Sequence, residues 1–148
     1  MCPKALLAFL FMLFAWNLRA GPIRILFLGH ESEHHNSNEY YPLLGKAGQW
    51  IGLSFDNTDH MPHNLVIIAP GTYQSVGKAT DLMLSDPSAA SKNYVPDHAK
   101  VIAQTPMVLP KSKFELVFQA PEQPGRYPFL CTFPGHWRLM KGELIILP

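Results

Sequence analysis

The sequence contains only two cysteines, Cys2 and Cys131, among its 148 residues. It also lacks a long apolar run, because the run at residues 5–16 is shorter than the ~18 residues that a membrane-spanning helix usually needs. Lys4 precedes that run, and the pattern predicts a secretory signal peptide at residues 1–20, with an uncleaved anchor as the alternative. Cleavage would leave Cys131 as the sole cysteine, which excludes an internal disulfide in the exported protein.

Neither sign of charge is in excess, since the chain has 12 Lys and Arg against 11 Asp and Glu. Removing residues 1–20 takes away Lys4 and Arg19, and 12 minus 2 leaves 10 positive charges against 11 negative ones. Nucleic-acid binding and electrostatic membrane binding both need clustered basic residues, so this balance argues against both. The single cysteine that would remain after cleavage has no partner for a disulfide. It is open to four explanations: a buried structural cysteine, a nucleophile, an intermolecular bridge or a metal ligand.

From residue 49 onward, short segments rich in β-branched and aromatic residues alternate with Pro, Gly, Asn and Asp. This texture predicts a mainly β protein with the architecture of an antiparallel β-sandwich. Residues 114–120 and 126–131, joined by a turn, are expected to pair as a hairpin. Helical spacing predicts a short helix at residues 76–84, inside an excursion from the sandwich that spans 72–110. The other expected strands are 50–55, 64–69 and 142–147.

The segment CTFPGHWRLMKG places a thiol, an imidazole and a thioether on one loop between two expected strands, at Cys131, His136 and Met140. Each residue alone has an ordinary interpretation, as an inert buried thiol, a surface histidine or core packing. Together they offer three soft or borderline ligands, and His63 is the leading candidate for a second imidazole. Two His, one Cys and a weak axial Met are the ligand set of blue-copper electron-transfer sites. Zinc accepts similar ligands, but a thioether is a poor zinc ligand, so the set favours copper.

With these residues in view, residues 46–147 resemble the cupredoxin family, in particular its azurin-like and auracyanin-like blue copper proteins. The resemblance rests on HNLVI, KNYVPDHAKVIAQT, APEQPGRYPFLCTFPGH and LMKGELII. It implies a Greek-key β-sandwich holding one copper ion that alternates between Cu(I) and Cu(II). It also implies a one-electron carrier, not an enzyme, exported to the periplasm or the extracellular space. The metal ligands implied by position are three equatorial residues and one axial residue: His63, Cys131, His136 and Met140.

The resemblance also assigns roles to residues around the ligands. Asn64 would tie the two ligand loops together, and the backbone amides of Asn64 and Phe133 would donate to the Cys131 sulfur. The carbonyl before the first histidine, a weak axial ligand in azurin, belongs here to Pro62.

His136 would present its ring edge to solvent within an apolar rim, where a redox protein such as a cytochrome or an oxidoreductase docks. Pro62, Pro134 and Trp137 are the candidates for that rim, with packing of Trp137 on the loop as the alternative interpretation.

Residues 21–45 do not look like the start of a cupredoxin, and IRILFLGHESEHHNSNEYYPLL resembles the opening of ThuA-like domains. We therefore expect a signal peptide at 1–20, an atypical segment at 21–45 and an azurin-like domain at 46–148. Within the atypical segment, residues 23–28 and 40–44 are candidate substitute strands.

Three alternatives to an electron carrier follow from the sequence. A copper storage or delivery protein would use the same four ligands. A fusion or internal deletion of a ThuA-like and an azurin-like domain would have no function. A hydrolase-like enzyme would use the acidic and histidine cluster of the atypical segment, although one strand and one loop cannot enclose a substrate. That cluster consists of Glu31, Glu33, His34 and His35, with His30 beside it.

Overall fold

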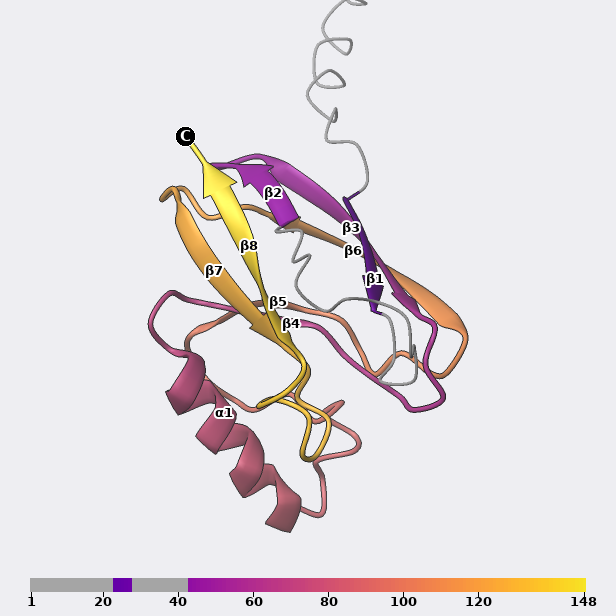
Figure 1. Ribbon diagram of the computed structural model, residues 1–148. Coiled ribbons are helices and arrows are strands. Elements are labelled where there is room, and N and C mark those ends of the chain that lie inside the picture. Colours follow the sequence, from indigo (N-terminus) through magenta and orange to yellow (C-terminus); the bar gives the residue numbers. More distant parts are fainter. Residues whose placement is uncertain (1–22, 28–42) are drawn as a thin grey trace, which may run out of the picture.

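The computed structural model of this chain describes residues 23–27 and 43–148. Within these ranges two β-sheets face each other, and one helix lies beside the larger sheet (Figure 1). The smaller sheet has the order β1 (Ile23–Phe27), β3 (Trp50–Asn57), β6 (Ser112–Gln119). The larger sheet has the order β2 (Leu43–Lys46), β8 (Lys141–Leu147), β7 (Gly125–Leu130), β4 (Val66–Ile68), β5 (Val101–Gln104). The predicted mainly β sandwich is confirmed.

The main core lies between the two sheets because the strands alternate apolar and polar residues. On β3, Ile51, Leu53 and Phe55 are buried while the residues between them are only partly so. Such side chains contribute roughly 1.5–3 kcal/mol each when they are fully removed from water. The facing sheet supplies Leu144 and Ile146 of β8 to the same cluster. These contacts hold the ends of β4 and β7, from which the candidate site extends.

A second apolar cluster covers the other face of the larger sheet, where α1 (Tyr73–Leu82) packs. On β4, Ile67 contributes to the core between the sheets, whereas Val66 and Ile68 belong to the second cluster. Val76 of α1 and Trp137 complete that cluster. Because both of its faces are covered, β4 is apolar at every position. A single 3₁₀ turn, η1 (Met83–Ser85), follows α1.

The predicted hairpin of residues 114–120 and 126–131 is wrong. β6 pairs antiparallel with β3, and β7 pairs with β4 and β8 in the other sheet. The turn between β6 and β7 therefore crosses from one sheet to the other, held by Ala120 N–H donating to the Gln49 carbonyl at 2.7 Å. Both strands alternate because each buries one face against the opposite sheet. Alternation identifies the buried face of a strand but not its neighbour.

The excursion between 72 and 110 differs in detail from its prediction. The helix begins three residues before the predicted start, directly after the Pro70-Gly71 turn, where Gly71 has φ +74°. The chain then returns to the sheet as β5, an edge strand antiparallel to β4 that the sequence prediction had placed outside the sandwich.

Two strands come from the atypical N-terminal segment. β1 lies parallel to β3, within the predicted range 23–28, and β2 lies parallel to β8, three residues beyond the predicted start at 40. The predicted signal peptide lies outside the described residues, and the division into 21–45 and 46–148 stays a prediction. Among the described residues, no helix is long and apolar enough to cross a membrane.

Candidate metal centre

The three candidate equatorial residues come from two parts of the chain that the larger sheet brings together. His63 lies before β4 in an isolated bridge, where its backbone N–H donates to the Val108 carbonyl at 3.1 Å and Val108 N–H returns a bond of 2.7 Å. Cys131 directly follows β7, which pairs with β4. The ends of these adjacent strands therefore place His63 and Cys131 next to each other.

His136 reaches the same point because the loop from Cys131 to Met140 folds back on itself. Cys131 N–H donates to the Met140 carbonyl at 3.0 Å and closes the base of the loop. Inside it, His136 N–H donates to the Phe133 carbonyl at 3.0 Å, and Gly135 has φ +86°. Only glycine adopts such a positive φ without strain, so Pro134-Gly135 makes a tight bend in the loop.

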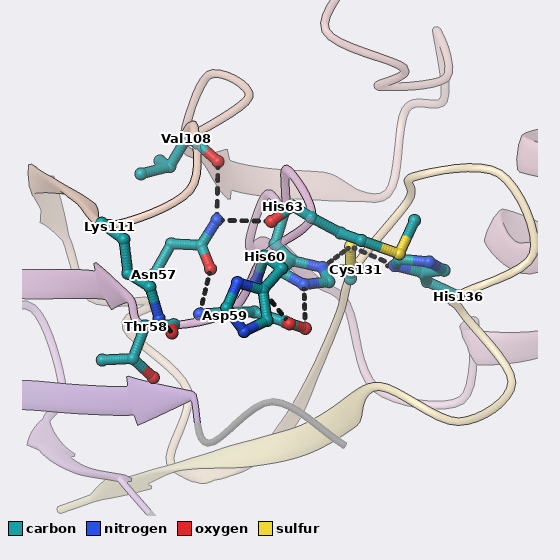
Figure 2. Close-up of polar contacts among 10 residues, drawn as sticks. Asn57, Thr58, Asp59, His60, His63, Val108, Lys111, Cys131 and His136 are labelled. Carbon is teal, nitrogen blue, oxygen red and sulfur yellow. Dashed lines mark hydrogen bonds and ion pairs between the residues drawn. The ribbon is translucent and has the colours of Figure 1, made fainter. Parts of the chain in front are cut away.

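The three side chains form one compact donor set (Figure 2). Cys131 Sγ lies 3.6 Å from His63 Nδ1 and 3.7 Å from His136 Nδ1, and the two nitrogens are 3.2 Å apart. A point equidistant from the three atoms lies about 2.0 Å from each, near the ~2.0–2.3 Å typical of metal–nitrogen and metal–sulfur bonds. The donor set therefore fits one metal ion of the copper or zinc type.

The Cys131 thiol is fully buried, and its surroundings act on its pKa in opposite directions. Burial raises the pKa of Cys131, while hydrogen bonds from the backbone N–H groups of Asn64 and Phe133 lower it. Burial has the larger effect, so the metal-free thiol keeps its proton well above neutral pH. Because a metal binds the thiolate, metal binding at this site would release that proton.

Asn64 links the two loops through its buried side chain. Its Nδ2 donates to Thr132 Oγ1 at 2.7 Å and to the Asn93 carbonyl at 2.8 Å, and its Oδ1 accepts from Thr132 N–H at 2.7 Å. Both Asn64 and Thr132 are 0% exposed, so water cannot replace these bonds. The residue after His63 is thereby joined to the residue after Cys131.

His136 is half-buried, in contrast to His63, which is 1% exposed. Partial burial lowers the pKa of His136, and the nearby His63 ring adds to the effect. The imidazole is therefore neutral at pH 7, as a metal ligand must be. The Phe133 ring lies against it with a centroid distance of 4.9 Å.

Met140 and Pro62 flank the donor set along the chain. Met140 N–H donates to the His136 carbonyl at 2.8 Å, which places Met140 at the base of the ligand loop and half-buried. Pro62 directly precedes His63 and is also half-buried. The axial roles of the Met140 thioether and the Pro62 carbonyl stay predictions.

Trp137 does not contribute to a solvent-exposed rim, so that part of the prediction is wrong and the alternative of packing holds. It is 3% exposed and lies against α1, where its Nε1–H donates to Asp81 Oδ1 at 2.8 Å. Tyr73 Oη donates to the Trp137 carbonyl at 2.5 Å, and their rings meet edge to face. Pro134 is half-buried, whereas the apolar residues exposed near the histidines in sequence are Met61 and Leu139.

Sequence reasoning missed Asp59, whose Oδ2 lies 2.9 Å from His63 Nε2 (Figure 2). The available signal was a carboxylate four residues before a candidate ligand histidine, since ligating histidines commonly donate their other N–H to a carboxylate. The acidic and histidine cluster near residue 30 lies outside the described residues, as does any role for it.

Comparison with known proteins places the donor set in a family. The family model described as copper binding proteins, plastocyanin/azurin family, matches residues 46–147. Auracyanin-A of Chloroflexus aurantiacus is 32% identical over 106 residues, which are 70% of this chain and 63% of that protein. Azurin of Pseudomonas aeruginosa is 37% identical over 89 residues, which are 58% of this chain and 57% of that protein. The chain thus spans about three fifths of the length of these relatives.

Solved structures agree with the fold. Auracyanin A of Chloroflexus aurantiacus, described as a "blue" copper protein, superposes with a TM-score of 0.65 at 28% identity, over 86% of this chain and 100% of that one. Dithionite-reduced auracyanin of Roseiflexus castenholzii superposes with a TM-score of 0.62 at 30% identity, over 74% of this chain and 86% of that one. None of these matches supports the resemblance of residues 23–44 to a ThuA-like domain.

Proposed function

Because this chain belongs to the plastocyanin/azurin family of copper-binding proteins, we propose that it holds one type 1 copper ion and carries single electrons between redox partners. The proposed ligands are His63, Cys131 and His136 in the equatorial plane and Met140 as the axial ligand. The observation that carries the proposal is the trio of donor atoms no more than 3.7 Å apart. Bound copper would supply a redox couple that alternates between Cu(I) and Cu(II).

The protein's contribution is to keep the ligands in place and away from water. Cys131 and His63 are 0% and 1% exposed, and their loops are joined by the buried bonds of Asn64. Backbone N–H groups donating to the Cys131 sulfur withdraw electron density from it, which helps set the reduction potential. Since the donors are held by contacts within the protein, a change of oxidation state would require little movement of the ligands.

Electrons would enter and leave at His136, the one member of the donor set that is half-buried. Met61 is 44% exposed and Leu139 is 78% exposed, and both lie close to the site in sequence. An apolar surface of this kind suits the brief docking of a redox protein, because weak encounters use small contact areas. No substrate is transformed in this role, so we propose a carrier and not an enzyme. The relatives and the predicted signal peptide together support an exported protein, in the periplasm or outside the cell.

The test is to load the purified protein with copper(II) and record its visible absorption and electron paramagnetic resonance spectra. We expect an intense blue thiolate-to-copper band with a small copper hyperfine splitting. Cys131→Ser should abolish the colour, because no thiolate remains. Met140→Leu should keep the colour and raise the potential, because loss of the axial donor favours Cu(I).

A pale, ordinary copper spectrum from the unchanged protein would contradict the proposal. Repeated reduction and reoxidation provide a second check, since a carrier keeps its copper throughout. Loss of copper on reduction would instead favour the storage or delivery function.

A further inference from the structure

The turn before His63 places the Asp59 carboxylate against one edge of the His63 ring (Figure 2). Asp59 Oδ2 lies 2.9 Å from His63 Nε2, and the two side chains are 19% and 2% exposed. The opposite ring nitrogen, Nδ1, faces Cys131 Sγ and His136 Nδ1. One edge of the ring therefore meets the carboxylate and the other meets the donor set.

The protonation of the two groups follows from this arrangement. Asp59 accepts hydrogen bonds through both carboxylate oxygens, from the His63 ring and from His60 N–H, and an aspartate carboxyl group with an ordinary pKa of about 3.9 is ionised at neutral pH. An ionised carboxylate only accepts hydrogen bonds, so Nε2 of His63 must carry the proton. A neutral ring with a proton on Nε2 has its lone pair on Nδ1, which is the atom that faces the other donors.

Asp59 cannot easily turn away from the ring, because its turn is fixed by other bonds. Its second oxygen accepts from His60 N–H at 2.6 Å, and its own N–H donates to Asn57 Oδ1 at 3.0 Å. Asn57 is 0% exposed, and its Nδ2 donates to the carbonyls of Met61 and Val108 at 2.8 and 2.9 Å. Val108 also pairs with the His63 backbone, so the turn and the ligand share one anchor.

The turn is fixed on its other side as well, where Lys111 Nζ donates to the Thr58 carbonyl. The His136 ring has no carboxylate partner of the kind that Asp59 provides for His63. Its hydrogen-bonding contacts within residues 43–148 are made by Nδ1, with Cys131 Sγ and His63 Nδ1. The two imidazoles therefore differ: His63 is buried and oriented by a carboxylate, and His136 is partly exposed.

We propose that Asp59 is a positioning residue that orients His63 as an Nδ1 ligand and, through its negative charge, lowers the reduction potential of the bound copper. The proposal rests on the copper function proposed above. A carboxylate behind a ligand imidazole makes the ring a stronger donor and stabilises the more highly charged ion. The binding affinity for Cu(II) therefore increases more than that for Cu(I). Each tenfold change in the ratio of the two affinities corresponds to a change of about 59 mV in the potential for one electron.

The experiment compares three variants with the unchanged protein. Asp59→Asn removes the charge in a side chain of the same shape, and Asp59→Ala removes the charge and the hydrogen bonds. Asp56→Asn is the matched control, because Asp56 lies three residues away and pairs with Lys113 at 2.9 Å on the protein surface. The measurements are the potential, the affinities for Cu(I) and Cu(II), and the His63 tautomer in the metal-free protein by ¹⁵N nuclear magnetic resonance.

In the unchanged metal-free protein we expect His63 to carry its proton on Nε2, and in Asp59→Ala to become a mixture of tautomers. Both Asp59 variants should bind Cu(II) about 10–100-fold more weakly, lose less affinity for Cu(I), and show a higher potential. Asp56→Asn should match the unchanged protein. A role in folding alone would lower stability without moving the tautomer or the potential.

An Nδ1–H tautomer of His63 in the unchanged protein would overturn the proposal, as would equal potentials in Asp59→Asn and Asp56→Asn. The tautomer measurement needs no variant, so a failure of Asp59→Ala to fold does not remove the test. If the unchanged protein lacks the blue band, the copper function fails, and the metal-free tautomer still decides whether Asp59 orients the ring.

Discussion

The contact between Gly77 of α1 and Trp137 of the ligand loop allows a sharp test of how the loop is held. A methyl group added at Gly77 would meet the Trp137 ring carbons Cε3, Cζ3 and Cδ2 at 2.4, 2.5 and 2.6 Å. Ordinary carbon–carbon contacts are about 3.5 Å or longer, so the ring or the helix must move by roughly 1 Å. The ring cannot shift without disturbing its bond to Asp81 or its contact with Tyr73.

Two opposing effects decide whether Gly77→Ala raises or lowers the free energy of unfolding. Alanine stabilises a helix interior by about 1 kcal/mol relative to glycine. Overpacking of a well-filled site costs about 1–3 kcal/mol. Because the new contacts are this short and the ring is fixed on two sides, overpacking should win. We expect the free energy of unfolding to fall by about 1 kcal/mol.

The assay is urea unfolding of the metal-free protein followed by circular dichroism, since bound metal would add its own stabilisation. Gly52→Ala is the matched control, because nothing lies within 4 Å of the added methyl group there. It reduces the freedom of the unfolded chain in the same way, and its effect should be small or stabilising. In the copper-loaded protein, Gly77→Ala should also change the spectrum, because Trp137 directly follows His136.

A double-mutant cycle identifies the cause. Trp137→Phe removes part of the ring that meets the new methyl group, so Gly77→Ala should cost less in that background. The reasoning would be refuted if Gly77→Ala were as stable as Gly52→Ala, or if its cost were unchanged by Trp137→Phe.

Two further predictions concern the anchors of the same loops. Asn64→Ala should lower the stability of the metal-free protein by about 2–4 kcal/mol in urea unfolding, because it leaves buried polar groups of Thr132 unpaired; a loss below 1 kcal/mol would contradict this. The pKa of Asp81 lies below its usual 3.8, mainly because of hydrogen bonds from Arg138 and Trp137. The stability that ionised Asp81 contributes to the folded protein is therefore present above pH 3.8 and is lost as the pH falls through the lowered pKa of the folded state. Asp81→Asn should be less stable than the unchanged protein at pH 7, with the difference shrinking in acid; a difference independent of pH would count against the ion pair.

The approach of His136 to Cys131 could be predicted from sequence because the two residues lie on one short loop. Cys131, His136 and Met140 lie within ten residues between two strands, and Gly135 permits the bend that folds the imidazole toward the thiol. Placing His63 beside Cys131 needed only one assumption, that the strand after His63 and the strand before Cys131 are neighbours in a sheet. The pairing of β4 with β7 meets that assumption.

The errors arose where burial depends on residues distant in sequence. Trp137 is an ordinary candidate for an exposed aromatic residue until α1 and Gly77 are placed against it. Likewise, the alternation of β6 and β7 is compatible with a hairpin and with a crossing between sheets. Only the partner strand β3 decides between them. No local pattern contains that information, because register and sheet order are properties of the whole core.

The two imidazoles of the candidate site differ in their surroundings: His63 is buried and held in place, whereas the His136 ring is partly exposed. His63 is buried, bonded to Asp59, and joined through Asn64 to the loop of Cys131. His136 is bonded through its backbone and is followed by Trp137, which α1 holds, yet its own ring remains half-buried. The proposed electron carrier would need ligands that do not move and one ligand that a partner can approach. The excursion that carries α1 thus serves the site, because it fixes the loop beside His136 without covering the ring.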